Sequence, residues 1–188
     1  MRTSFRPAAV TLVVAIGLTA SGCATDDPAP KPSTSTSAAP LFASDEEALA
    51  AAEEAYAAYL AVVDNVLHGG GMDTSKLADV AVSDALDQAN EDALEFRTLM
   101  LHTEGSTSIR SIALQQNDSA ARGSGEVVVA YVCEDASSVK LLDSIGVSQV
   151  DVNRPNITPF EVSFSKQDDS ERLMVHSRVL WSGENPCG

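Results

Sequence analysis

The fold is decided by one segment, Glu126-Val-Val-Val-Ala-Tyr-Val-Cys133, which follows the turn residues Gly123-Ser-Gly125. Valine and tyrosine dominate this segment. Such residues favour strands, because β-branched and aromatic side chains pack well on a pleated surface. The sequence therefore predicts a central strand over 126–133.

Apolar and polar residues alternate in two later segments, 160–165 and 172–182. The apolar members are Phe160, Val162 and Phe164 in the first segment, and Leu173, Val175, Val179 and Trp181 in the second. Asp168-Asp-Ser170 lies between the segments and is typical of a turn, so we expect an antiparallel hairpin. Weaker strand signals lie in 108–116 and 139–143.

The first half of the chain carries helical patterns instead. Ser44-Asp-Glu-Glu47 is a capping box, with Ser44 as the N-cap and Glu47 at the third helical position. Apolar residues then recur every three or four positions, at Leu49, Ala52, Tyr56, Tyr59, Val63 and Leu67. Gly69-Gly-Gly71 should end this helix.

A second long helix is expected after a short one around 74–82. Ser83 should cap it and Gly105 should end it. Its buried face is predicted to comprise Leu86, Ala89, Ala93, Phe96 and Met100.

Helices first and strands afterwards predict an α+β fold, with the N-terminal helices packed on one face of a curved antiparallel sheet. Residues 41–188 contain neither an internal repeat nor a second linker. A chain of this length buries about 68–70% of its unfolded surface, which is enough for one self-sufficient core. We therefore expect a single domain from Leu41 to Gly188.

Residues 1–22 have the pattern of an export signal. Arg2 and Arg6 precede the apolar run Ala8–Ala20, which is shorter than the ~20 residues that a membrane-spanning helix needs. Small residues then lead to Cys23. This order resembles the lipobox of bacterial lipoproteins, and the resemblance implies that Cys23 becomes the acylated N-terminal residue and anchors the chain in the membrane. The alternative is a plain secretory signal with an incidental cysteine.

Residues 23–40 are expected to form a tether. Four prolines and a Ser/Thr tract follow Cys23, and this composition favours an extended, solvated chain. Such a segment would act as a spacer between the lipid and the domain; a glycosylated stalk is the alternative.

The charge balance restricts the partners. The chain has 12 Lys plus Arg against 27 Asp plus Glu, a formal net charge of −15. That sign opposes electrostatic binding to nucleic acid or to an anionic membrane surface. We expect no nucleic-acid partner.

Two cysteines remain once Cys23 is assigned to lipid. Disulfides persist in exported proteins, and the even number supports a bridge between Cys133 and Cys187. Two free thiols are the alternative. No CxxC or HxxxH spacing occurs, so no metal site is expected.

Three features together resemble one family. They are the lipobox with its tether, the alanine-rich helix around Tyr56-Ala-Ala-Tyr59, and Tyr131-Val-Cys-Glu-Asp135 with a distant Cys187. This combination is similar to small secreted lipoproteins of high-GC Gram-positive bacteria with a cystatin-like, NTF2-like α+β cone. The resemblance spans about 41–187. The sequence departs from it at Arg172–Val175, where such domains often carry a tryptophan, whereas here Trp181 comes later.

That fold implies no single activity, because it hosts isomerases, dehydratases and binding modules alike. His68 and His102 are expected in the last turns of helices, where a cation is favoured. His176 lies on a strand, opposite the Val175 face, and either lines a pocket or is exposed. Asp135 and Asp143 are expected at strand ends or turns.

No sequence pattern predicts a reaction or a cofactor. GxSxG, GxGxxG, P-loop and HExxH patterns do not occur. The leading hypothesis is therefore a non-catalytic, membrane-tethered module that contacts an envelope protein or the cell wall. The alternative is a cone that binds a small apolar or amphipathic ligand at unassigned residues. Enzyme activity through His176 and Asp135 ranks third.

Overall fold

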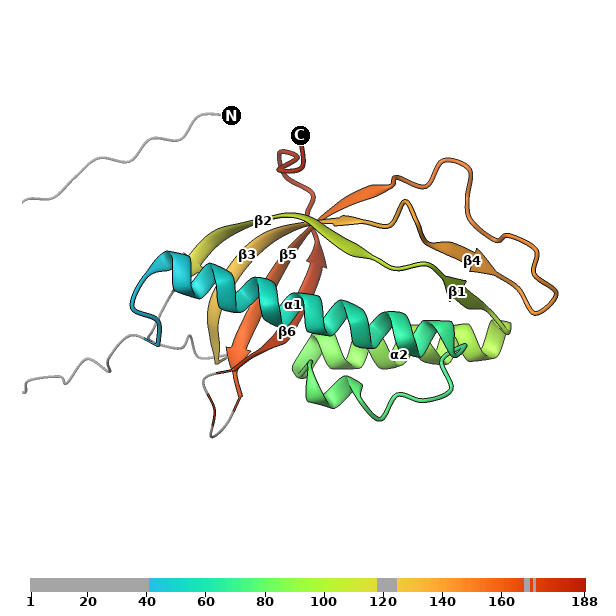
Figure 1. The fold of residues 1–188 in the computed structure, drawn as a ribbon, viewed down its shortest axis with the longest axis horizontal. Coiled ribbons are helices and arrows are strands. Elements are labelled where there is room, and N and C mark those ends of the chain that lie inside the picture. Colours follow the sequence, from blue (N-terminus) through green and yellow to red (C-terminus); the bar gives the residue numbers. More distant parts are fainter. Residues whose placement is uncertain (1–40, 118–124, 168–169, 171) are drawn as a thin grey trace, which may run out of the picture. The chain divides into compact units, whose positions relative to one another are not determined.

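The computed structural model describes residues 41–117, 125–167, 170 and 172–188. The expected export signal, Cys23 with its lipid, and the tether lie outside these residues. The elements are α1 (Asp45–His68), η1 (Leu77–Asp79), α2 (Ser83–Leu99), β1 (His102–Glu104), β2 (Ser108–Asn117), β3 (Glu126–Asp135), β4 (Lys140–Leu142), β5 (Ile157–Lys166) and β6 (Leu173–Leu180) (Figure 1).

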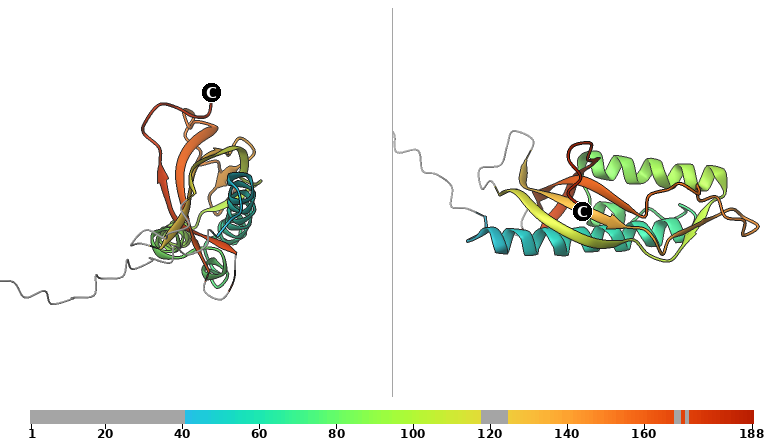
Figure 2. Two further views of the ribbon diagram at one scale, coloured as in Figure 1. Left: turned by 90° about the vertical axis from the view of Figure 1, so that its left-hand side faces the viewer. Right: turned by 90° about the horizontal axis from the view of Figure 1, so that it is seen from above.

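The strands form an open antiparallel sheet in the order β2-β3-β5-β6, and β1 pairs with β4 in a second, two-stranded sheet. Helices α1 and α2 pack on the larger sheet, so the α+β prediction is confirmed (Figures 1 and 2). The central position of β3 and the antiparallel pairing of β5 with β6 also agree with the sequence. Within the described ranges, no helix is both long and apolar enough to cross a bilayer.

Helix α1 begins where the capping box predicts. The Glu47 amide donates to Ser44 Oγ at 3.2 Å. The Glu47 carboxylate reaches back to the backbone N–H of Ala43 at 2.8 Å, one residue before the position expected for the box. Three acidic residues in the first turn stabilise the helix, because their negative charges lie at the positive end of the helix dipole.

The buried face of α1 is rotated slightly from the expected stripe. Ala52, Tyr56 and Tyr59 are buried as predicted, whereas Leu49, Val63 and Leu67 are only half-buried. The other buried positions are Ala48, Ala55, Leu60 and Val66. Small alanines let the helix approach the sheet closely, and Tyr56 fills the space between them against the Phe164 ring, 6.3 Å away edge to face.

The triple glycine ends α1 and also allows a close passage. Gly71 has a φ of 72°, and a Cβ there would lie 1.9 Å from the carbonyl oxygen of Ala93 on α2. Only glycine fits at this contact. The chain can therefore turn against α2 directly after the helix.

Helix α2 differs from the prediction at both ends. Val82, not Ser83, is the N-cap, and the helix ends at Leu99 with Met100 in the left-handed conformation, well before Gly105. Its buried face is the alanine row Ala85, Ala89 and Ala93, and Met100 is exposed. The chain instead enters β1, so the assignment of His102 to a helix was wrong.

A β-bulge changes the face of β6 halfway along the strand. Val175 pairs with Phe164, but Ser177 pairs with the preceding residue, Ser163, so His176 is the extra residue. Beyond the bulge, Arg178 shares a face with its partner Val162, which is fully buried. The prediction of uninterrupted alternation along 173–181 is therefore wrong, and Val179 is exposed.

Candidate interaction surface

Three polar side chains from α1, β3 and β6 meet beneath the sheet. Arg178 binds the Glu134 carboxylate through two nitrogens, Nε and Nη2, each at 2.8 Å. Tyr56 donates its hydroxyl proton to the same carboxylate and accepts from Arg178 Nε at 3.0 Å. The guanidinium carbon also lies 3.5 Å from the centre of the Phe160 ring. We call Tyr56, Glu134 and Arg178 the buried triad.

Burial and mutual contacts shift the pKa values of Tyr56 and Arg178 in the triad. Glu134 is 6% exposed, so its charge needs the bidentate partner that Arg178 supplies. Burial, and next the Glu134 charge, raise the pKa of Tyr56 well above its usual value. Burial alone would lower the pKa of Arg178. The hydrogen bonds to Glu134 and electrostatic interactions with Tyr56, Glu134 and Tyr59 outweigh burial and raise this pKa overall. Tyr56 therefore stays neutral and Arg178 stays charged near neutral pH. The contacts of the triad join α1, β3 and β6.

The three histidines lie in separate surroundings. His68 is in the last turn of α1, as predicted, and donates Nε2–H to the Gly105 carbonyl at 2.6 Å. His102 lies in β1 opposite Leu142. His176 occupies the β6 bulge and is half-buried.

The two aspartates have the expected local roles. Asp135 ends β3, and its side chain accepts from the Ser137 amide at 2.8 Å. Hydrogen bonds from the Ser137 side chain, and next from its amide, lower the pKa of Asp135. Asp143 organises the turn after β4 by accepting from the amides of Ile145 and Val147. In the described part of the chain, no three His, Cys, Asp or Glu side chains gather as metal ligands would.

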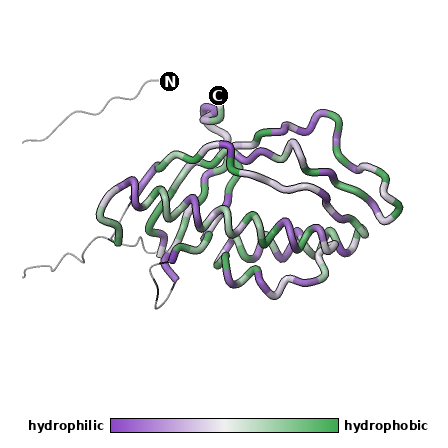
Figure 3. The backbone as a smooth tube through the Cα atoms, in the orientation of Figure 1, coloured by the Kyte–Doolittle hydropathy of each residue, from purple (hydrophilic) through white to green (hydrophobic). Residues whose placement is uncertain are grey.

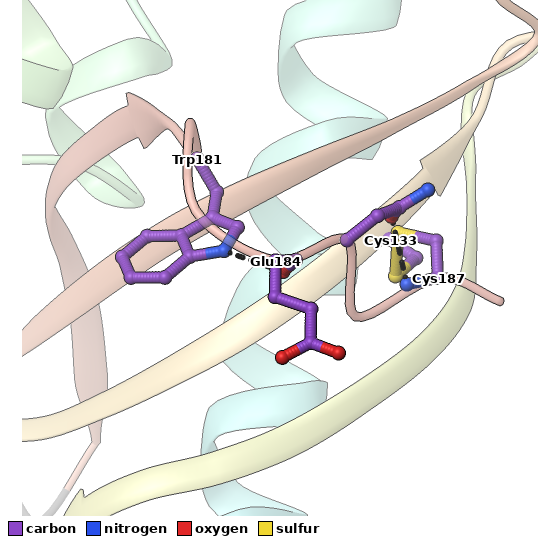
Figure 4. The surroundings of a disulfide bond; sticks show 5 residues. Cys133, Trp181, Glu184 and Cys187 are labelled. Atoms are coloured by element: carbon purple, nitrogen blue, oxygen red, sulfur yellow. Dashed lines mark hydrogen bonds between the residues drawn. A yellow bond between two sulfur atoms is a disulfide. The ribbon is translucent and has the colours of Figure 1, made fainter.

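A disulfide joins Cys133 of β3 to Cys187 near the C-terminus, as the cysteine count predicts, with a Cα–Cα distance of 5.6 Å (Figure 4). The segment between β6 and Cys187 is held by Trp181, whose indole N–H donates to the Glu184 carbonyl at 2.9 Å. The Trp181 ring also packs on the Tyr131 ring of β3, with 4.6 Å between the two ring centres. The disulfide and the contact between Trp181 and Tyr131 therefore attach the C-terminal segment to the central strand β3.

The end of α2, β1 and the loop after β4 lie together at one end of the domain (Figures 1 and 2). Large apolar side chains of this region are exposed. Met72 is 70% exposed, Met100 67% and Ile145 83%, and Val147 is also exposed. Met72, Met100 and Ser144 line one groove of about 410 Å³, and Ile145 and Val147 belong to the turn that contains Ser144. Figure 3 shows that the tip of the loop after β4 contains hydrophobic residues. We call Met72, Met100, Ile145 and Val147 the distal patch.

Sequence reasoning assigned neither the triad nor the distal patch. The triad depends on the β6 bulge, which reverses the side on which Arg178 lies. The patch brings together residues before α2, after α2 and after β4, and the helical spacing predicts Met100 on a buried face. Among the triad and patch residues, the sequence pattern predicts Tyr56 correctly, as a buried residue of α1.

Comparisons with known proteins bear on the fold alone. No family model matches the chain, and no curated protein does. Among solved structures, the crystal structure of the intermembrane space region of the chloroplast protein ARC6 is similar at a TM-score of 0.51 and 14% identity, over 71% of this chain and 97% of that one. A de novo designed β-sheet protein matches at a TM-score of 0.30 and 17% identity, over 75% of this chain and 96% of that one. The resemblance to NTF2-like lipoproteins stays a prediction.

Proposed function

We propose that this chain is a non-catalytic module of the cell envelope, anchored by lipid on Cys23, that contacts another envelope protein through the distal patch. The observation that carries the proposal is that exposed Met72 and Met100 line one groove, next to the turn that carries exposed Ile145. Apolar surface gathered in this way marks interaction sites, because leaving it in water is unfavourable. Methionine is also common at binding surfaces, since its flexible side chain adapts to a partner.

The interior supports this choice over the alternative. A ligand in the cone would need space between the sheet and the helices. Tyr56, Val132 and Phe164 fill that region and are fully buried. The polar groups found there bind one another as the buried triad. The observations therefore favour a function of the outer surface.

The anchor has a direct test. Replacing Cys23 by serine removes the thiol that would carry the acyl chains. Because each buried methylene contributes about 0.8 kcal/mol to membrane binding, we expect the variant to move from the membrane pellet to the soluble fraction. Cell fractionation with immunoblotting measures this. A variant that stays in the pellet would contradict the lipid anchor, and Ser33→Ala, in the expected tether, is the control that should remain membrane-bound.

The distal patch is tested by single charges. Met100→Glu and Ile145→Glu each place a carboxylate where the partner would bury apolar surface, so we expect at least about a tenfold loss of complex. The control is Leu94→Glu, since Leu94 is exposed on α2 but belongs neither to the groove lining nor to the turn that carries Ile145. Quantitative cross-linking in intact cells measures the complex, and circular dichroism checks the fold. Equal cross-linking of all three variants and the parent chain would refute the proposal.

A further inference from the structure

The groove beside the distal patch combines basic side chains with apolar ones. Its lining includes three basic and three apolar residues: His68, Arg97, His102, Met72, Met100 and Leu101. None of the described residues that line it is an aspartate or a glutamate. The chain as a whole has 27 acidic residues against 12 lysines and arginines, so this groove is a local exception to the overall charge.

The guanidinium of Arg97 has no acidic partner within the described parts of the chain. It makes neither an ion pair nor a hydrogen bond there, whereas Lys76, Lys140 and Arg178 each pair with a carboxylate. The positions three and four residues away along the helix, which would lie beside Arg97, carry no acid. Arg97 can therefore bind a carboxylate from outside the chain, and its planar fork suits two carboxylate oxygens at once.

Carboxylates that lie near the groove in the sequence are held elsewhere. Asp73 and Asp143 accept from amides of their own turns, and Glu104 forms an ion pair with a lysine of β4 at 3.0 Å. Glu95 comes two residues before Arg97, so it lies on another side of α2. The positive charge of Arg97 is therefore left facing solvent at the groove.

The apolar part of the lining lies beside this charge. Met72 and Met100 expose most of their side chains, and both line the groove with Arg97. Methionine is unbranched and flexible, so it adapts to the shape of an apolar partner. An apolar side chain packed on the two methionines would also exclude water, and an ion pair next to it gains strength when water is excluded. The groove therefore suits a ligand that carries both groups.

We propose that the distal patch binds a segment of a partner protein in which a carboxylate side chain lies next to an apolar one. The carboxylate pairs with Arg97, and the apolar side chain packs on Met72 and Met100. This inference rests on the function proposed above and adds the chemistry of the partner. The net charge of −15 opposes both an anionic lipid surface and a second copy of this chain, so the occupant is a different protein.

Two capped peptides titrated onto the full-length chain test the pairing. One has the central sequence leucine-glutamate-leucine, and the matched peptide has glutamine in place of glutamate. We expect the glutamate peptide to bind about fivefold more tightly, the upper range for an exposed ion pair. Methyl NMR should show shifts at Met72 and Met100 but none at Met174, which is buried outside the groove. Equal binding of the two peptides, or binding of neither, would overturn the proposal.

Two variants of equal charge check the role of Arg97. Arg97→Gln and Arg110→Gln each change the net charge from −15 to −16, but Arg110 is an exposed residue of β2 outside the groove. We expect Arg97→Gln to bind both peptides equally, because the apolar contacts remain and the cation is gone. Arg110→Gln should keep the preference for glutamate. A preference lost in both variants would show only long-range attraction and refute the pairing.

Cross-linking in intact cells separates this inference from the proposed function. Loss of the complex in Met100→Glu, with full retention in Arg97→Gln, would leave the distal patch in place and refute the carboxylate. Retention in both variants would refute both proposals. Binding to phosphatidylglycerol vesicles that depends on Arg97, or self-association in light scattering that depends on it, would overturn the choice of a protein partner.

Discussion

Replacing Arg178 by methionine is expected to lower the free energy of unfolding by about 3–5 kcal/mol, because it leaves the Glu134 carboxylate buried without its cation. The Glu134 side chain is 7% exposed and the Arg178 side chain 20%, so water screens the pair weakly. Arg178 is the bidentate partner of this carboxylate. Urea unfolding of the oxidised protein measures the loss.

A matched variant distinguishes an uncompensated charge from lost packing. Combining Arg178→Met with Glu134→Leu and Tyr56→Phe removes the whole buried triad and leaves no orphaned polar group. Replacing a buried ion pair by apolar residues of similar size is often neutral or stabilising. We therefore expect the triple variant to recover most of the stability that the single variant loses. A loss below about 1 kcal/mol in Arg178→Met would mean that the triad behaves like an exposed ion pair.

Removing the disulfide is also expected to lower the free energy of unfolding by several kcal/mol, because the unfolded chain gains conformational entropy when the cross-link is absent. The bridge closes a loop with a sequence separation of 54 residues, and the chain-entropy model assigns about 4 kcal/mol to a loop of that length. Cys187→Ser should therefore lower the urea midpoint strongly. Cys133 is buried in the central strand, so alanine is its suitable replacement.

Three comparisons check the origin of that effect. Cys187→Ser, Cys133→Ala and the double variant should lose the same free energy, since each removes the same cross-link. Adding a reductant to the parent protein should reproduce the loss, and adding it to the double variant should change nothing. An unchanged midpoint on reduction would contradict a stabilising role for the bridge.

Local signals in the sequence were sufficient for much of the fold. The start of α1 was predictable because Ser44 and Glu47 act within one turn of each other. β3 and the β5–β6 hairpin were predictable because β-branched content and alternation are properties of single segments. The bridge between Cys133 and Cys187 followed from the number of cysteines and the expected export.

Features that depend on distant partners could not be predicted in this way. The bulge at His176 appears only when β6 is aligned with β5, and it turns Arg178 towards Glu134. The exposure of Met100 follows from the early end of α2, where a non-glycine residue takes the left-handed conformation. The buried triad and the distal patch can therefore be identified only from the three-dimensional structure.

The disulfide near the C-terminus also limits how far the domain can be stretched. A force applied between Leu41 and Gly188 passes from β3 to the C-terminal segment through the Cys133–Cys187 bond and bypasses β5 and β6. The 54-residue separation represents roughly 190 Å of extended chain at about 3.5 Å per residue, and this length stays locked while the bond is intact. Under tension, the oxidised domain would yield only the chain that precedes Cys133.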